Sequence, residues 1–148
     1  MTISLSFLDG HEFYKDEKCI SMWFDYVNEI FDNYKDKDCE DFLNSNKAFL
    51  VNDDKETIGF GIYHNEENKT ENIRAMILLE FYTKPEFRSI KRFLETSKVI
   101  KKLLSGRHFN RWYCGVATSQ KRKINAYTYL GFVPFKEIKE FTIMEMEI

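Results

Sequence analysis

An almost uninterrupted apolar run, Ile73 to Thr83, is the feature that most limits the fold of this chain. A strand of this composition is typically buried on both faces, which requires helices packed on both sides of the sheet. Amphipathic helical spacing occurs both before and after the run. The sequence therefore predicts a mixed α/β domain, with a central sheet and helices on both of its faces.

Three stretches have the three- and four-residue apolar spacing of amphipathic helices. They are residues 18–34, whose apolar stripe ends in Phe31 and Tyr34, residues 90–104, closed by Ser105-Gly106, and a third helix that begins at a cap on Thr118 or Ser119 and runs to Leu130. Asp16 is expected to cap the first helix, and Gly131 to follow the third at its C′ position. A short helical turn is expected over residues 39–43.

Alternating or apolar segments bounded by turn residues predict further strands. They cover residues 2–8, 47–51, 57–63, 111–116, 132–135 and 140–148. Asp9-Gly10 ends the first strand, residues 52–55 form a turn, and residues 65–72 form a charged loop. The 148 residues carry no linker, so residues 1–148 are expected to form a single domain.

Several classes of protein are excluded by the cysteines, histidines and apolar runs. Three widely spaced cysteines do not fit a disulfide framework, and the three histidines lie too far apart for a metal site, so no metal is expected. No segment approaches the ~20 apolar residues of a membrane span, and residues 1–10 lack the features of a secretory signal. We therefore expect a cytoplasmic protein without a membrane partner.

The net charge of −2 hides a separation of charge along the chain. Residues 1–83 contain 8 basic and 18 acidic residues, whereas residues 84–123 contain 12 basic and 2 acidic ones. A basic segment in an otherwise acidic chain favours an anionic partner. The acidic half suits either a solvated surface or contact with a cationic amine or a basic protein.

Four local motifs occur in the order expected of a known superfamily. They are Ala48-Phe49-Leu50-Val51 with Ile58-Gly59-Phe60-Gly61-Ile62, then Leu78-Leu79-Glu80-Phe81-Tyr82-Thr83, then Pro85-Glu86-Phe87-Arg88, and finally Ala126-Tyr127-Thr128-Tyr129-Leu130-Gly131-Phe132. With this order of elements, the chain resembles the Gcn5-related N-acetyltransferase (GNAT) superfamily over about its whole length. The resemblance implies a GNAT-like acyl-CoA N-acyltransferase fold and transfer of an acetyl group from acetyl-CoA to a small amine or a protein amine.

The acyl-CoA loop departs from the superfamily pattern. Two glycines of that pattern are replaced by Lys91 and Phe93, and no glycine lies between Gly61 and Gly106. The resemblance places the loop at Arg88, Ser89, Ile90, Lys91, Arg92 and Phe93. Bulky side chains obstruct close approach of the backbone to a phosphate, but Lys91 and Arg92 are able to replace amide contacts with ion pairs.

Two residues are candidates for the chemistry. The resemblance implies that Tyr127 is the general acid that protonates the leaving thiolate; the alternative is that Tyr127 only packs its helix onto the sheet. Glu80 is the only charged residue in residues 77–83 and is a candidate base whose pKa is raised by burial; alternatively it pairs with a nearby cation. Cys114 has no histidine close in sequence and is a poor nucleophile candidate.

The remaining binding assignments concern backbone and charge. The resemblance implies that the backbone of Phe81, Tyr82 and Thr83 pairs with the pantetheine arm, and that residues 121–123 meet the adenosine side of CoA. Lys98, Lys101 and Lys102 are expected to form a solvated helix face.

Two other functions stay open. Residues 111–131 also resemble short acetyltransferase-like proteins of tailed phages, some of them virion components, which allows a catalytically degenerate structural or host-interaction protein with an assembly partner. The basic segment also suits nucleic acid, with Phe87, Phe93 or Trp112 stacking on bases. The pI near 6.0 argues against that third function.

Overall fold

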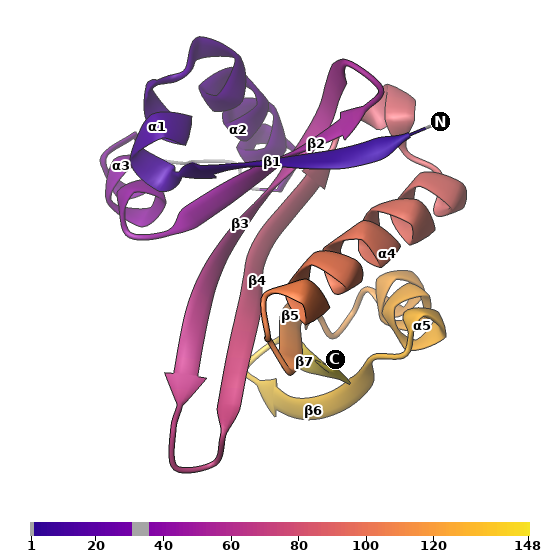
Figure 1. Cartoon of the computed structure of the whole chain (residues 1–148). Helices are drawn as coiled ribbons and strands as arrows, with labels where there is room; N and C mark the ends of the chain where they lie inside the picture. The colour runs from indigo at the N-terminus through magenta and orange to yellow at the C-terminus, as the bar shows by residue number, and fades with distance from the viewer. Residues whose placement is uncertain (1, 31–35) are drawn as a thin grey trace. The chain divides into compact units, whose positions relative to one another are not determined.

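The computed structural model describes residues 2–30 and 36–148. The elements, in chain order, are β1 (Ile3–Asp9), α1 (Gly10–Lys15), α2 (Glu17–Ile30), α3 (Asp36–Asn44), β2 (Lys47–Asp53), β3 (Glu56–Asn68), β4 (Ile73–Thr83), η1 (Pro85–Phe87), α4 (Ile90–Gly106), β5 (Arg111–Ala117), α5 (Lys121–Leu130), β6 (Val133–Ile138) and β7 (Phe141–Glu147) (Figure 1).

The strands form one mixed sheet. Among the described residues it has seven strands in the order β1-β2-β3-β4-β5-β7-β6, and the parallel pair is β4 with β5. The predicted mixed α/β architecture is thus confirmed. By contacts the chain divides into two compact units, and each is described separately below. The first unit is Met1–Tyr63 with Glu80–Arg92, and the second is His64–Leu79 with Phe93–Ile148.

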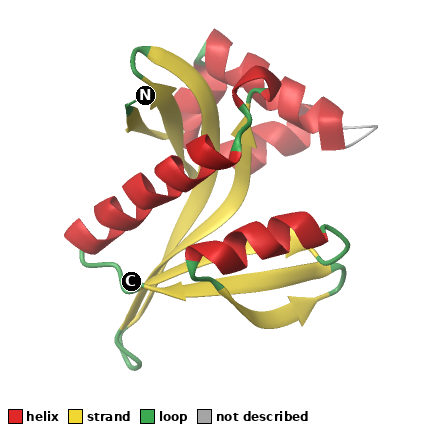
Figure 2. Ribbon diagram, turned by 90° about the vertical axis from the view of Figure 1, so that its right-hand side faces the viewer, coloured by secondary structure: helices red, strands yellow, loops and turns green. Residues whose placement is uncertain are grey.

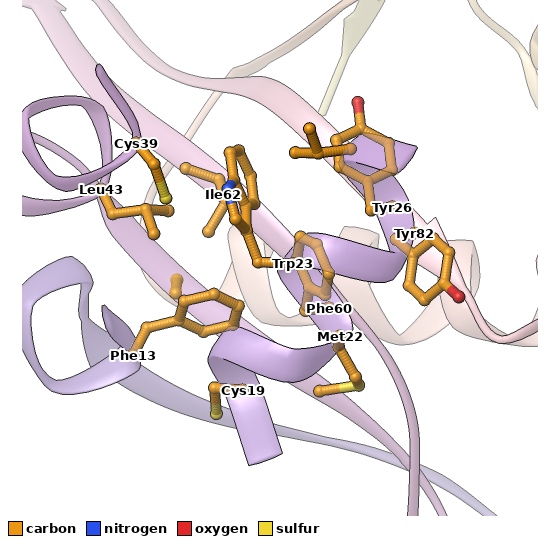
Figure 3. Packing of buried hydrophobic residues seen from close by; sticks show 12 residues of the cluster. Phe13, Cys19, Met22, Trp23, Tyr26, Cys39, Leu43, Phe60, Ile62 and Tyr82 are labelled. Atoms are coloured by element: carbon orange, nitrogen blue, oxygen red, sulfur yellow. The ribbon is translucent and has the colours of Figure 1, made fainter. Parts of the chain in front are cut away.

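An aromatic core holds the first unit together. Trp23 and Tyr26 of α2 lie against Phe60 of β3, with ring centroids 5.9 and 5.8 Å apart, and Phe13 of α1 contacts the same ring at 5.1 Å. Figure 3 shows these side chains converging from the helices onto the strands. Of the stripe predicted over residues 18–34, Trp23 and Val27 are buried, whereas Phe24 and Ile30 are exposed; Phe31 and Tyr34 lie outside the described residues. The buried face of α2 is completed instead by Cys19, Met22 and Tyr26.

The start of α2 confirms the predicted cap. The carboxylate of Asp16 accepts the backbone N–H groups of Lys18 and Cys19, each at 3.0 Å, and these bonds satisfy donors that the first helical turn leaves free. The backbone bond from Cys19 is the largest of the effects that lower the pKa of Asp16. The short helical turn expected at residues 39–43 is the longer helix α3.

Two features of the first half were predicted wrongly. Asp9-Gly10 ends β1 but also begins α1, where the Glu12 carboxylate accepts the Asp9 backbone N–H at 3.3 Å, half of a capping box. Residues 65–68 belong to β3 rather than to a loop, because pairing with β4 continues to the turn at residues 69–72. The polar or charged, exposed side chains of residues 65–68 lack the apolar alternation by which a strand is predicted from sequence.

A second aromatic core lies in the second unit. Trp112 of β5 contacts Phe132 with centroids 4.8 Å apart, and Phe132 contacts Tyr127 of α5 at 5.3 Å. Gly131 between them has φ of 108°, the left-handed conformation expected at the C′ position. The predicted cap of α5 was wrong: Gln120 takes that position, and the Thr118 hydroxyl instead hydrogen-bonds that of Thr142 at 2.9 Å.

None of the helices in the part of the chain that the structure describes is long and apolar enough to cross a membrane.

Candidate active site

The last residues of β4 form the first part of the candidate site, within the first unit. Glu80 is half-buried and accepts a hydrogen bond from the hydroxyl of Tyr26 on α2. The sequence predicted a base or a paired carboxylate here, and the Tyr26 hydroxyl is one partner of that carboxylate. Tyr26 was missed, because the predicted apolar stripe of this helix did not include it, although the structure buries it.

The backbone at the end of β4 alternates between two edges. The Lys84 N–H donates to the carbonyl of Ile58 on β3 at 2.8 Å. By the alternation of an antiparallel pair, Tyr82 faces β3 and the backbone groups of Phe81 and Thr83 face the other edge. The parallel register of β4 with β5 ends at the pair Leu78–Cys114, whereas β4 continues to Thr83.

The side chain of Tyr82 is buried under an arginine. Its ring lies 5.5 Å from that of Phe60, and the Arg88 guanidinium stands 5.5 Å from its centroid. Burial, followed by the negative charges of Glu29 and Asp25, raises the pKa of Tyr82. The phenol therefore stays neutral at physiological pH and serves as a packing surface.

The Arg88 guanidinium is hydrogen-bonded to two other residues of the first unit. Its Nε donates to the Thr83 carbonyl at 2.8 Å, and its Nη2 donates to both carboxylate oxygens of Glu29 on α2, at 3.0 and 2.8 Å. Glu29 was not predicted as a site residue, since it looks like any solvated helix position. Arg88 thus positions the end of β4, and the Thr83 carbonyl already accepts one hydrogen bond.

Arg92 is also paired. Its Nε lies 3.0 Å from Oδ2 of Asp53, whose side chain is only 10% exposed, and its guanidinium stands over the Phe87 ring at 5.3 Å. The prediction that Arg92 replaces the missing amide contacts to phosphate meets this competing partner. Asp53, the last residue of β2, was missed because carboxylates beside turns are common in sequence.

The start of α4 is capped by a side chain. The Ser89 hydroxyl accepts the Arg92 backbone N–H at 3.1 Å, which removes one free donor from the first helical turn. Ile90 is 78% exposed and Lys91 is also exposed. Within residues 2–30 and 36–148, no carboxylate pairs with Lys91, whereas Arg88 and Arg92 of the 88–93 loop are both ion-paired.

Tyr127 and Phe93 are brought together in the second unit. The two rings meet edge to face at 5.4 Å, and Phe132 closes the other side of Tyr127. Burial, with a smaller contribution from Cys114, raises the pKa of the Tyr127 hydroxyl. No hydrogen-bond partner for that hydroxyl occurs among the described residues. Tyr127 thus packs against Phe93 and Phe132, and whether it also acts as the acid stays a prediction.

The structure also places the remaining candidates, which are Cys114, Trp112 and the basic residues at the start of α5. Burial raises the pKa of Cys114 to about 12, which leaves the thiol protonated and unsuited to attack. Trp112 is 1% exposed and has no surface for stacking on a base. Lys121, Arg122 and Lys123 are exposed at the start of α5. The described residues hold no cluster of metal-ligating side chains.

No family model matches the sequence, and no curated protein matches it. Solved structures match over the full chain. Arabidopsis thaliana Naa50, in complex with a CoA-Ac-MVNAL bisubstrate analogue, has a TM-score of 0.69 at 14% identity and 100% coverage of both chains. Campylobacter jejuni N-acetyltransferase PseH, in complex with acetyl coenzyme A, has 0.68 at 21% identity and 99% coverage of both.

A GNAT-family acetyltransferase from Listeria monocytogenes has a TM-score of 0.69 at 12% identity, with 99% of this chain and 95% of that chain covered. The chain therefore has the fold of the GNAT N-acetyltransferases, as the motifs predicted.

Proposed function

We propose that this chain is an N-acetyltransferase that moves the acetyl group of acetyl-CoA to an amine by direct attack. The observation that carries the proposal is the full-length likeness to N-acetyltransferase structures, among them one with acetyl coenzyme A and one with a CoA bisubstrate analogue. The chemistry requires an amine that has lost a proton, a polarised thioester and a proton donor for the leaving thiolate. The chain's own residues supply candidates for two of these needs.

Glu80 is the proposed base. Its carboxylate accepts the Tyr26 hydroxyl, which fixes the orientation of the carboxylate. A lone pair beyond this bond would accept a proton from the ammonium form of the substrate, directly or through one water. The product of that step is a neutral amine able to attack the thioester carbonyl.

The end of β4 is proposed to hold the pantetheine arm. The Phe81 N–H and C=O and the Thr83 N–H face the edge of β4 opposite β3, and the Thr83 C=O already receives Arg88. Amide groups of pantetheine would pair with the remaining three as an added strand does. Arg88 and Glu29 keep this strand end in place.

The diphosphate is proposed to bind at the start of α4. Backbone N–H groups and the positive end of the 17-residue helix favour an anion there. The bond of Arg92 N–H to Ser89 leaves the N–H groups of Ile90 and Lys91 for this contact, and the Lys91 ammonium adds a direct ion pair. In this proposal the Lys91 ammonium replaces part of the phosphate contact that backbone N–H groups next to glycine make in the superfamily pattern.

Tyr127 is the proposed acid. Its raised pKa keeps the hydroxyl protonated, so it has a proton to give to the CoA thiolate as the thioester bond breaks. Phe93 and Phe132 fix the ring from two sides. The rigid ring would hold the hydroxyl in one position.

Thermal unfolding with and without acetyl-CoA tests the proposal. A ligand that binds only the folded state raises the free energy of unfolding by mass action, and Tm rises with it. At a ligand concentration of a hundred times Kd the gain in free energy is about 2.7 kcal/mol. We expect a saturable rise in Tm with acetyl-CoA and no rise with acetate at the same ionic strength. Release of free CoA thiol on addition of a panel of amines then measures transfer. An unchanged Tm at millimolar acetyl-CoA would overturn the proposal.

A further inference from the structure

One face of strands β5, β7 and β6, within the second unit, carries apolar side chains to solvent. On β7, Thr142, Met144 and Met146 are buried, while Phe141 on the alternate face is 52% exposed. Figure 2 shows α5 over one side of these strands, and the contact of Tyr127 with Phe132 identifies that side as the buried one. The opposite side is called the outer face here.

Strand register defines the members of the outer face. Tyr113, Glu145 and Val133 are opposite one another across β5, β7 and β6, and so are Ala117, Phe141 and Ile138. Phe135 joins them at a bulge in β6, with its ring 5.6 Å from that of Tyr113. The exposed fractions of Val133, Phe135, Ile138 and Phe141 are 56%, 53%, 46% and 52%.

This composition is the reverse of what a solvated sheet face requires. The open face of an antiparallel sheet usually alternates polar residues with the buried apolar ones. Contiguous exposed apolar side chains instead mark an interaction surface. Half of each of these four side chains is in water, so an apolar partner surface would remove that area from water and stabilise the complex.

Two charges on the outer face decide which partner fits. Lys136 lies beside Phe135, with Nζ 5.6 Å from the ring centroid, and no carboxylate of the described residues pairs with it. Glu145 on β7 accepts the Tyr113 hydroxyl at 2.6 Å, lies 4.0 Å from Nε of Arg111 and has a side chain that is 23% exposed. Arg111 also pairs with Glu147 on the same face at 3.2 Å. Lys136 is opposite Ile143, so the positive and negative charges are offset across the apolar patch.

We propose that the outer face is a homodimer interface, in which a two-fold axis brings Lys136 of each copy to Glu145 of the other. An isologous interface uses the same patch twice and must therefore be complementary to itself. An apolar patch on which Lys136 is offset from the partly exposed Glu145 meets that condition. The contact is made by the face rather than by the free edge of β6, because Pro134 and the bulge interrupt that edge.

Sedimentation velocity of the full chain, over a range of concentrations, is the first test. We expect a species of twice the 17.8 kDa chain mass, and its conversion to monomer by Phe135→Asp, which places a carboxylate in the apolar contact. Lys102→Gln on the exposed side of α4 changes the net charge by the same one unit and leaves the dimer intact. A wild-type chain that stays monomeric at all concentrations, or a dimer unaffected by Phe135→Asp, overturns the proposal.

A charge exchange tests the geometry and does not depend on Phe135. Lys136→Glu alone places two pairs of like charges in the homodimer, and Glu145→Lys alone does the same with the opposite sign. Each variant should be monomeric, with a thermal melt that shows it is folded. Mixing the two restores both ion pairs and should give a heterodimer, whereas mixing that yields no dimer contradicts the proposed two-fold.

Discussion

The Nε atom of Arg92 lies 3.0 Å from Oδ2 of Asp53, so an arginine expected to meet phosphate is bonded to the last residue of β2, beside the turn of the β2–β3 hairpin. Arg88 pairs with Glu29 in the same way. The basic loop and the acidic first half thus neutralise each other within one compact unit. The charge that remains for a ligand is smaller than the sequence suggests.

Removal of the carboxylate from Asp53 should have opposite effects on stability and on ligand affinity. Asp53→Asn weakens a partly exposed ion pair, and we expect a loss of about 1 kcal/mol in the free energy of unfolding. The freed Arg92 should then strengthen acetyl-CoA binding, roughly two- to fivefold. Urea unfolding and calorimetric titration measure the two effects.

The neighbouring Asp54→Asn provides the control, since it removes the same charge from an exposed position of the adjacent turn. It should change neither quantity appreciably. Equal behaviour of the two variants would show that the Arg92–Asp53 bond has no special role.

Lys91 should contribute to acetyl-CoA affinity without contributing to stability. Lys91→Ala removes an exposed, unpaired ammonium, and we expect Kd to rise about fivefold with an unchanged Tm. The loss should shrink as salt increases, because exposed charges are screened. Lys102→Ala is the matched control, and a similar effect from both lysines would indicate only a general field of the basic segment.

Tyr127→Phe should separate catalysis from binding. The phenylalanine keeps the ring contacts with Phe93 and Phe132 and removes only the hydroxyl. We expect kcat to fall on the order of a hundredfold, within the usual range for general acids, while Kd for acetyl-CoA stays within about twofold. Tyr129→Phe, on the exposed side of α5, should leave both unchanged. An unaltered kcat for Tyr127→Phe would assign the residue to packing alone.

Alkaline pH should unfold the protein partly through Cys114. The folded-state pKa of about 12 lies above the ordinary value of 9.0, and burial is the cause. The unfolded chain therefore loses this proton first, and stability falls as pH rises from 9 towards 12, by about 1.4 kcal/mol per unit for one group. Urea unfolding of Cys114→Ala should show a shallower fall over this window, with a lower stability at pH 7 from the lost packing. Parallel pH curves would argue against the burial of an uncharged thiol.

Gly59→Ala should disturb the end of β4. A Cβ at this position would lie 2.1 Å from the Tyr82 carbonyl oxygen, a backbone atom, so one strand must move. We expect a loss of about 1–3 kcal/mol in stability and weaker acetyl-CoA binding. Gly115→Ala is the matched strand variant, because its Cβ meets only the Ile143 side chain at 3.6 Å. Comparable losses at both positions would mean that the close approach of Gly59 is unimportant.

The sequence allows prediction of features that depend on local periodicity. The bounds of β4, the Asp16 cap and the left-handed Gly131 follow from patterns within a few residues. Features that depend on pairing between distant segments were missed or misread. Glu29 and Asp53 are unremarkable by position, and only the fold brings them to Arg88 and Arg92. The wrong prediction that Thr118 caps α5 has the same cause, because the Thr118 hydroxyl bonds to Thr142 on a distant strand.

The two tryptophans of the chain give a spectroscopic consequence. Trp23 lies in the core of the first unit and Trp112 in that of the second, each at most 2% exposed. Trp112→Phe therefore leaves a single tryptophan in the first unit, and Trp23→Phe leaves a single tryptophan in the second. Coincident fluorescence transitions of the two variants in urea would mean that residues 1–148 unfold as one cooperative domain, as expected from their length. Separate transitions would give each unit its own stability.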